Sequence, residues 1–111
     1  MKTLVLHHKV VKFSRCDEKI LKSRRKVKNI LCKAILSARA TIVEARSYNH
    51  ARGVGCFVVI RESHVAITTF PEYSQAILDI HTCGTKMQPQ EAIRYVAAEL
   101  RAKSRKVMIF F

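Results

Sequence analysis

The tripeptide Glu62-Ser63-His64 places a hydroxyl between a carboxylate and an imidazole, where one alternating apolar run ends and the next begins. An acid, a base and a serine are the groups that build an activated nucleophile. A hydrolase would also need a strand-to-helix elbow of the GxSxG kind, which the sequence lacks. Neighbouring residues on a strand point to opposite faces, so His64 is poorly placed to act on Ser63. The pattern therefore gives little support to a serine hydrolase and also fits a polar turn.

The other side chains that could bind a metal show no motif spacing. No two of the four cysteines form a CxxC pair, and the five histidines do not form an HExxH motif, so no metal site is expected. The N-terminal segment predicts a strand rather than an export signal, and we expect reduced thiols and a cytoplasmic location. The residues concerned are Cys16, Cys32, Cys56 and Cys83, and His7, His8, His50, His64 and His81.

Apolar periodicity predicts the elements that would position these side chains. Alternating runs predict strands, and apolar residues spaced three and four apart predict two amphipathic helices. The first helix would cover about 17–38 and carry a basic face, and the second would begin with Pro89 at its first helical position. The predicted strands are 3–13, 40–48, 53–60, 64–70, a short one near 77–81, and 106–111.

These elements predict an α+β fold, a two-layer sandwich in the order β-α-β-β-β-α-β. An antiparallel-rich sheet would carry both helices on one face. With 111 residues, 49% of them hydrophobic, the chain is expected to form a single domain over 1–111. The face of the sheet that the helices leave uncovered would need a partner, and we therefore expect a homodimer.

The net charge of +13 is concentrated in the N-terminal half of the chain. Residues 1–52 hold 14 of the 21 lysines and arginines, many of them in the segment 19–33. Such a patch can attract nucleic acid, yet the sequence has no zinc-finger, KH or RNP motif. A solvated helix face is the preferred interpretation, and nucleic-acid binding is not expected. No apolar run approaches the roughly 20 residues that span a bilayer, so no membrane partner is expected either.

Residues 55–84, GCFVVIRESHVAITTFPEYSQAILDIHTCG, resemble the S-adenosylmethionine decarboxylase family in its short bacterial and archaeal form. The ESH, PEY and TCG motifs follow one another at the family's spacing, and the order of elements agrees over most of the chain. The resemblance implies a pyruvoyl-dependent decarboxylase of polyamine and spermidine biosynthesis that is made as a zymogen.

The resemblance also implies that Ser63 becomes the cofactor. Its hydroxyl would attack the carbonyl of Glu62 and convert the peptide bond to an ester, and a constrained corner would favour this shift. Elimination and hydrolysis would then leave two chains, 1–62 and 63–111. The pyruvoyl ketone would form a Schiff base with the amine of a small-molecule substrate and accept electrons as CO₂ leaves. His64 belongs to the same motif, and Cys83 would be the proton donor.

Further positions match substrate contacts of the family. Glu72 stands where the family binds a ribose, and a carboxylate can accept hydrogen bonds from two hydroxyls. Phe70 stands where the family has an aromatic residue near the substrate pocket. Asn49 replaces a phenylalanine that stacks on adenine, and Tyr48 and His50 lie beside it in the sequence.

Two positions depart from the family in groups that assist self-cleavage. Thr68 occupies the place of a processing histidine, and Gly55 occupies the place of a serine. Maturation would then use Thr68, His50 or His81, or would not occur.

Three functions stay open from the sequence. The leading hypothesis is decarboxylation of S-adenosylmethionine to its aminopropyl donor. The same fold and cofactor could act on L-arginine or L-ornithine, with Glu72, Glu44 or Asp79 binding the distal cation. An unprocessed, non-catalytic homologue could instead bind RNA or another acidic partner through its basic helix.

Overall fold

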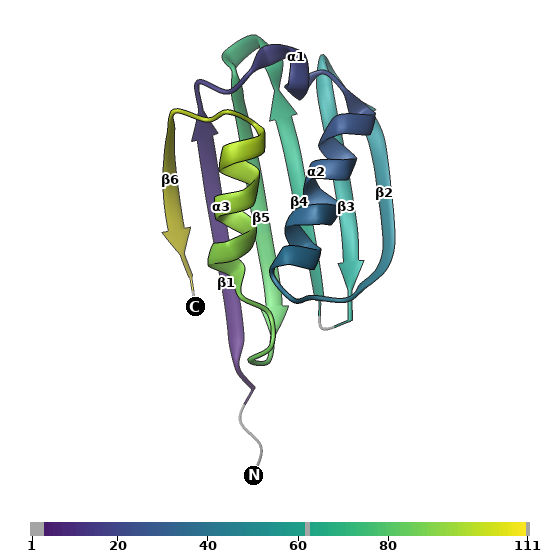
Figure 1. Cartoon of the computed structure of the whole chain (residues 1–111), viewed down its shortest axis with the longest axis vertical. Coiled ribbons are helices and arrows are strands. Elements are labelled where there is room, and N and C mark those ends of the chain that lie inside the picture. Colours follow the sequence, from purple (N-terminus) through teal and green to yellow (C-terminus); the bar gives the residue numbers. More distant parts are fainter. Residues whose placement is uncertain (1–3, 62, 111) are drawn as a thin grey trace.

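The computed structural model describes residues 4–61 and 63–110. In these ranges six strands form one antiparallel sheet in the order β2-β3-β4-β5-β1-β6. The two longer helices, α2 and α3, pack together and lie against one face of this sheet (Figure 1). The elements are β1 (Leu6–Ser14), α1 (Glu18–Leu21), α2 (Arg24–Ser37), β2 (Ile42–His50), β3 (Gly53–Ile60), β4 (Ser63–Phe70), the 3-10 turn η1 (Pro71–Tyr73), β5 (Gln75–Cys83), α3 (Pro89–Glu99) and β6 (Ser104–Ile109).

The predicted α+β sandwich, with helices on one face of an antiparallel sheet, is confirmed. The observed order has four consecutive strands between α2 and α3, one more than the predicted order β-α-β-β-β-α-β. The additional strand is β5, where the sequence predicts only a short strand near 77–81. It runs over nine residues because buried and partly exposed positions alternate along its whole length.

The helix predicted over 17–38 is divided into α1 and α2 by a second N-terminal cap, at Ser23. The carboxylate of Asp17 accepts a hydrogen bond from the backbone N–H of Lys19 at 2.9 Å and starts α1. The hydroxyl of Ser23, whose backbone is extended, accepts from the backbone N–H of Lys26 at 3.2 Å and starts α2. A serine in this conformation begins a helix, so it ends the preceding one.

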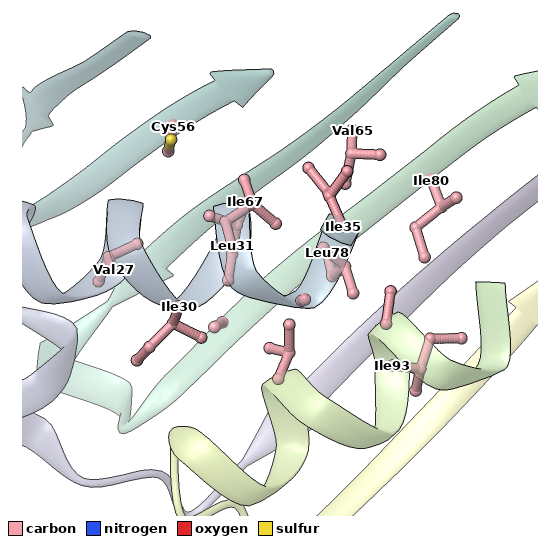
Figure 2. Close-up of a cluster of buried hydrophobic side chains, with 14 of the residues drawn as sticks. Val27, Ile30, Leu31, Ile35, Cys56, Val65, Ile67, Leu78, Ile80 and Ile93 are labelled. Atoms are coloured by element: carbon pink, nitrogen blue, oxygen red, sulfur yellow. The ribbon is translucent and has the colours of Figure 1, made fainter. Parts of the chain in front are cut away.

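The hydrophobic core lies between the helices and the sheet (Figure 2). One face of α2 and one face of α3 supply apolar side chains that meet those of the central strands. Each central strand gives every second residue to this core, so its remaining side chains point to the opposite face. The labelled core residues are Val27, Ile30, Leu31 and Ile35 of α2, Ile93 of α3, and Cys56, Val65, Ile67, Leu78 and Ile80 of the sheet.

Thr69 is a buried polar residue that ties α1 to the sheet. Its side chain is 1% exposed, and its hydroxyl donates to the carbonyl of Leu21 at 2.7 Å. The same oxygen accepts from the backbone N–H of Val54 at 2.8 Å. Gly53 lies against this residue, since a Cβ at position 53 would collide with the carbonyl of Thr69. One hydroxyl thus satisfies a helix end and a strand start.

Replacing this hydroxyl tests how the layers are joined. We expect Thr69→Val to lower the free energy of unfolding by about 1–3 kcal/mol, because it leaves the Val54 N–H and the Leu21 carbonyl buried without a partner. The measurement is urea unfolding at a fixed protein concentration. Thr68→Val, the same substitution one residue earlier on the opposite face, is the matched control and should change stability by less than about 0.5 kcal/mol. Equal losses in the two variants would refute the role of Thr69.

Candidate active site

The face of the sheet opposite α2 and α3, named the open face below, carries a row of histidines. On β4 the buried side chains Val65 and Ile67 face the helices, so His64 faces away from them. The strand register places His64 opposite His81 on β5, and His81 opposite His8 on β1. Three neighbouring strands therefore present imidazoles side by side.

The rings of this row are in contact. The rings of His64 and His81 stack, with their centroids 5.0 Å apart and an angle of 1° between their planes. His8 meets His81 edge-on, with the ring centroids 5.1 Å apart. Phe57 of β3 stacks on His64 at 5.2 Å, and Phe110 packs against His8 at 5.0 Å. Aromatic contacts at such distances add to the burial of the rings and restrict their orientation.

Ser63 lies at the start of β4, where its hydroxyl reaches two of these imidazoles. One of them is His64, so the expectation from strand alternation that His64 is poorly placed for Ser63 is wrong. The Oγ of Ser63 is 2.7 Å from Nδ1 of His81 and 3.3 Å from Nδ1 of His64. Ser63 is also opposite Ile60 of β3, so a connection of two residues, 61 and 62, joins the strands at this corner. The predicted cleavage residue Glu62 lies outside the described residues.

An acidic group lies in the next row of the open face. A carboxylate oxygen of Asp79 lies 3.0 Å from Nε2 of His8, and the Asp79 side chain is 44% exposed. The register places Asp79 opposite Ala66 on one side and Val10 on the other. The Asp79 carboxylate therefore contacts the histidine row at His8.

Cys83, the predicted proton donor, ends β5 two residues after His81 and therefore lies on the same face of that strand. It is partly exposed and lies opposite Leu6 of β1. The other three cysteines are buried in or against the core, and burial raises the pKa of the Cys16 and Cys56 thiols to about 11. Burial also raises the pKa of Cys32, partly opposed by Lys28. Among the four thiols, all within the described part of the chain, Cys83 is the one at the Ser63 end of the open face.

Thr68, the residue at the expected position of the processing histidine, is far from Ser63 in the same chain. The two residues are five positions apart on β4, which corresponds to about 16 Å along a strand. Thr68 is instead opposite Gly55 of β3. A Cβ at position 55 would overlap the ring of Tyr48, so the aromatic ring requires the glycine. The two departures from the family thus lie together, beneath Tyr48.

The predicted substrate contacts also gather at this far end of the sheet. Phe70 ends β4 and meets His50 edge-on at 6.3 Å, and Glu72 follows on the surface in η1. Tyr48 is 51% exposed on the open face. Asn49 is opposite the core residue Val54, so it belongs to the helix side of β2 rather than to the open face.

The predicted site residues therefore form two groups at opposite ends of the open face. Ser63, His64 and Cys83 belong to one end, and Tyr48, Thr68, Phe70 and Glu72 belong to the other. The sequence interpretation did not connect His8 with this site. The alternation of β1 indicates the face on which His8 lies, but only the pairing of β1 with β5 brings it to His81.

Two absences hold for residues 4–61 and 63–110, the described part of the chain. No three histidine, cysteine, aspartate or glutamate side chains in these ranges gather closely enough to hold a metal ion. In the same ranges, no helix has both the length and the apolar character that crossing a bilayer requires.

Comparisons with known proteins agree with the motifs and the fold. Residues 7–110 match the model of a family described as S-adenosylmethionine decarboxylase. The S-adenosylmethionine decarboxylase proenzyme of Thermodesulfovibrio yellowstonii is 37% identical over 97 residues, covering 86% of this chain and 72% of that protein. The proenzyme of Sulfurisphaera tokodaii is 33% identical over 88 residues, covering 79% and 72%.

A solved structure has the same fold. The adenosylmethionine decarboxylase from Aquifex aeolicus superposes with a TM-score of 0.87 at 21% identity, covering 97% of this chain and 90% of that one. The match of the family model over nearly the whole chain, together with the similarity to the two proenzymes, decides the family. This chain belongs to the S-adenosylmethionine decarboxylase family.

Proposed function

We propose that this chain is a precursor that cleaves itself between Glu62 and Ser63 and then decarboxylates S-adenosylmethionine for polyamine synthesis. The observation that carries the proposal is the hydroxyl of Ser63, held 2.7 Å from an imidazole nitrogen at a two-residue corner. The names of the related proteins, which are proenzymes of S-adenosylmethionine decarboxylase, support both the precursor and the substrate.

The residues around Ser63 fit a pyruvoyl group made from it. Ser63 is partly exposed and its hydroxyl reaches the histidines of the open face, so a carbonyl at this position would be accessible to a substrate amine. The group would supply an electron sink for the loss of CO₂. The chain's own residues would shape the site and move protons. His64 borders the site, and the thiol of Cys83 would return a proton to the substrate.

The separation of the two groups of site residues supports a homodimer. In an isologous pair, each protomer presents the same surface to the other. If two open faces packed with their strands antiparallel, the Ser63 end of one protomer would meet the Glu72 end of its partner. The open face also exposes apolar side chains, with Phe57 42% and Met108 50% exposed. A dimer would bury these side chains and complete the site.

The ion pairs of the three candidate acids favour Glu72 as the carboxylate that binds the substrate. Asp79 is paired with His8, and Glu44 is paired with Arg46 at 3.1 Å. Glu72 is exposed and forms no ion pair within the described residues. Tyr48, at the same end of the open face, offers an aromatic ring for adenine in place of the phenylalanine that Asn49 replaces. The aromatic ring of Tyr48 supports S-adenosylmethionine over arginine or ornithine, neither of which carries a base to stack on it.

Self-cleavage is tested by intact mass under denaturing conditions. We expect two chains, 1–62 and 63–111, from the purified parent, and one full-length chain from Ser63→Ala, which lacks the attacking hydroxyl. Ser47→Ala, a serine on β2 away from the corner, is the matched control and should cleave as the parent does. A full-length parent would instead favour an unprocessed homologue that binds an acidic partner through α1 and α2.

The role of Cys83 is tested on cleaved protein. We expect Cys83→Ser to release CO₂ from S-adenosylmethionine at least about 100-fold more slowly than the parent, because a general acid typically contributes 10²–10⁴ in rate. Arginine and ornithine, assayed side by side, should release little CO₂. Cys32→Ser, a thiol of α2 on the helix side of the sheet, should keep the parental rate. Unchanged turnover in cleaved Cys83→Ser would remove this residue from the mechanism.

The dimer is tested by sedimentation. We expect a parent of twice the chain mass and a monomeric Phe57→Glu, since the substitution replaces an apolar side chain of the interface with a charge that must lose its water on burial. Leu36→Glu, an exposed apolar residue on α2, should leave the mass unchanged. A monomeric parent at micromolar concentration would contradict the proposed interface.

A further inference from the structure

We infer that His81 is the base that activates Ser63 for self-cleavage, in place of a histidine at position 68. The inference rests on the proposed function and names the residue that makes it feasible in this chain. Among Thr68, His50 and His81, the three candidates that the sequence leaves open, His81 is the one in contact with the Ser63 hydroxyl.

Neither of the other two candidates contacts the Ser63 hydroxyl within the chain. Thr68 lies about 16 Å further along β4, and its hydroxyl is not a base near neutral pH. His50 ends β2 at the far end of the sheet, where its ring meets Phe70. An imidazole is the side chain that most readily exchanges protons near neutral pH, and His81 presents one directly to the hydroxyl.

The hydrogen-bond inventory of Ser63 decides between its two imidazole neighbours. A serine hydroxyl has one proton to donate and two lone pairs to accept with. Its Oγ is 2.7 Å from Nδ1 of His81 and 3.3 Å from Nδ1 of His64. The shorter contact fits the hydroxyl donating to His81, and the longer fits an Nδ1–H of His64 donating to the hydroxyl. His81 is therefore the proton acceptor, and His64 is a positioning residue that holds the oxygen.

The surroundings of His81 fix its ring for this task. It lies between His64, stacked on it at 5.0 Å, and His8, which meets it edge-on at 5.1 Å. His8 is in turn held by Asp79 at 3.0 Å. All four residues stand on paired strands, and side chains on rigid elements keep a catalytic geometry better than those on loops.

The step needs no partner beyond water. His81 takes the proton from Oγ of Ser63 as the oxygen bonds to the carbonyl carbon of Glu62. The C–N bond of the peptide then breaks, and the nitrogen of Ser63 takes the proton back from His81, which leaves an ester and a free amine. The Cα proton of residue 63 is then lost, and the ester breaks at Cβ to release the main-chain carboxylate of Glu62. A double bond between Cα and Cβ of residue 63 remains. One water then replaces the nitrogen, which leaves as ammonia, so that no oxidant or reductant is used.

The test follows cleavage of freshly made precursor by mass spectrometry over time. We expect His81→Gln to cleave at least about 100-fold more slowly than the parent, because glutamine keeps the size of the side chain and cannot take the proton. His81→Ala should regain cleavage when imidazole is added, which a purely structural role would not allow. His7→Gln, on the face of β1 opposite to His8, is the matched control and should cleave at the parental rate, and circular dichroism checks that each variant is folded.

The outcomes separate this inference from the function it rests on. If the parent cleaves and His81→Gln keeps pace with it, the assignment of His81 is wrong while the pyruvoyl function stands. If the parent stays intact, the proposed function fails. The proposed activation of residue 63 by His81 is then tested separately, by the rate at which a cysteine at position 63 is alkylated. A Ser63→Cys precursor should then react with iodoacetamide at pH 7 about 10-fold faster than Ser63→Cys/His81→Gln, since an adjacent base activates a thiol. Equal alkylation rates would overturn the assignment.

Discussion

The pairing of β4 with β5 is the constraint on which the candidate site depends. Its register sets His64 beside His81 and brings His81 to the hydroxyl of Ser63. A slip of one residue would turn His81 toward the helices, because side chains alternate between the two faces of a sheet. The buried residues Val65 and Ile80, opposite each other in the core, oppose such a slip. The packing on the helix side thus determines the chemistry available on the open face.

Much of the fold can be predicted from the sequence because its signals are local. Alternating apolar residues mark the strands, and Pro89 marks the start of α3. The break between α1 and α2 depends on Ser23, whose choice between helix and cap depends on its backbone and so on its neighbours. The predicted strand over 77–81 is shorter than β5 because the polar residues Gln75 and Thr82 flank its apolar run, although β4 pairs with both of them.

The site is predictable only in part, because its residues meet through long-range pairing. Motifs single out Ser63 and Cys83, and the structure places both at one end of the open face. The contact of His8 with Asp79 joins residues 71 positions apart, and no single sequence gives the register that creates it. The motif residues at the far end are likewise close to Ser63 in sequence and distant in space, since an extended strand carries them away from it.

The proposed activity requires that Ser63 becomes the cofactor of the protein. Its most direct test is the accurate mass of the C-terminal chain, residues 63–111, isolated from the purified protein. A pyruvoyl group at position 63 makes this chain lighter by one ammonia than a chain beginning with an ordinary serine, and this is the mass we expect. A C-terminal chain with an intact serine at its start would show simple hydrolysis of the peptide bond and would contradict the claim.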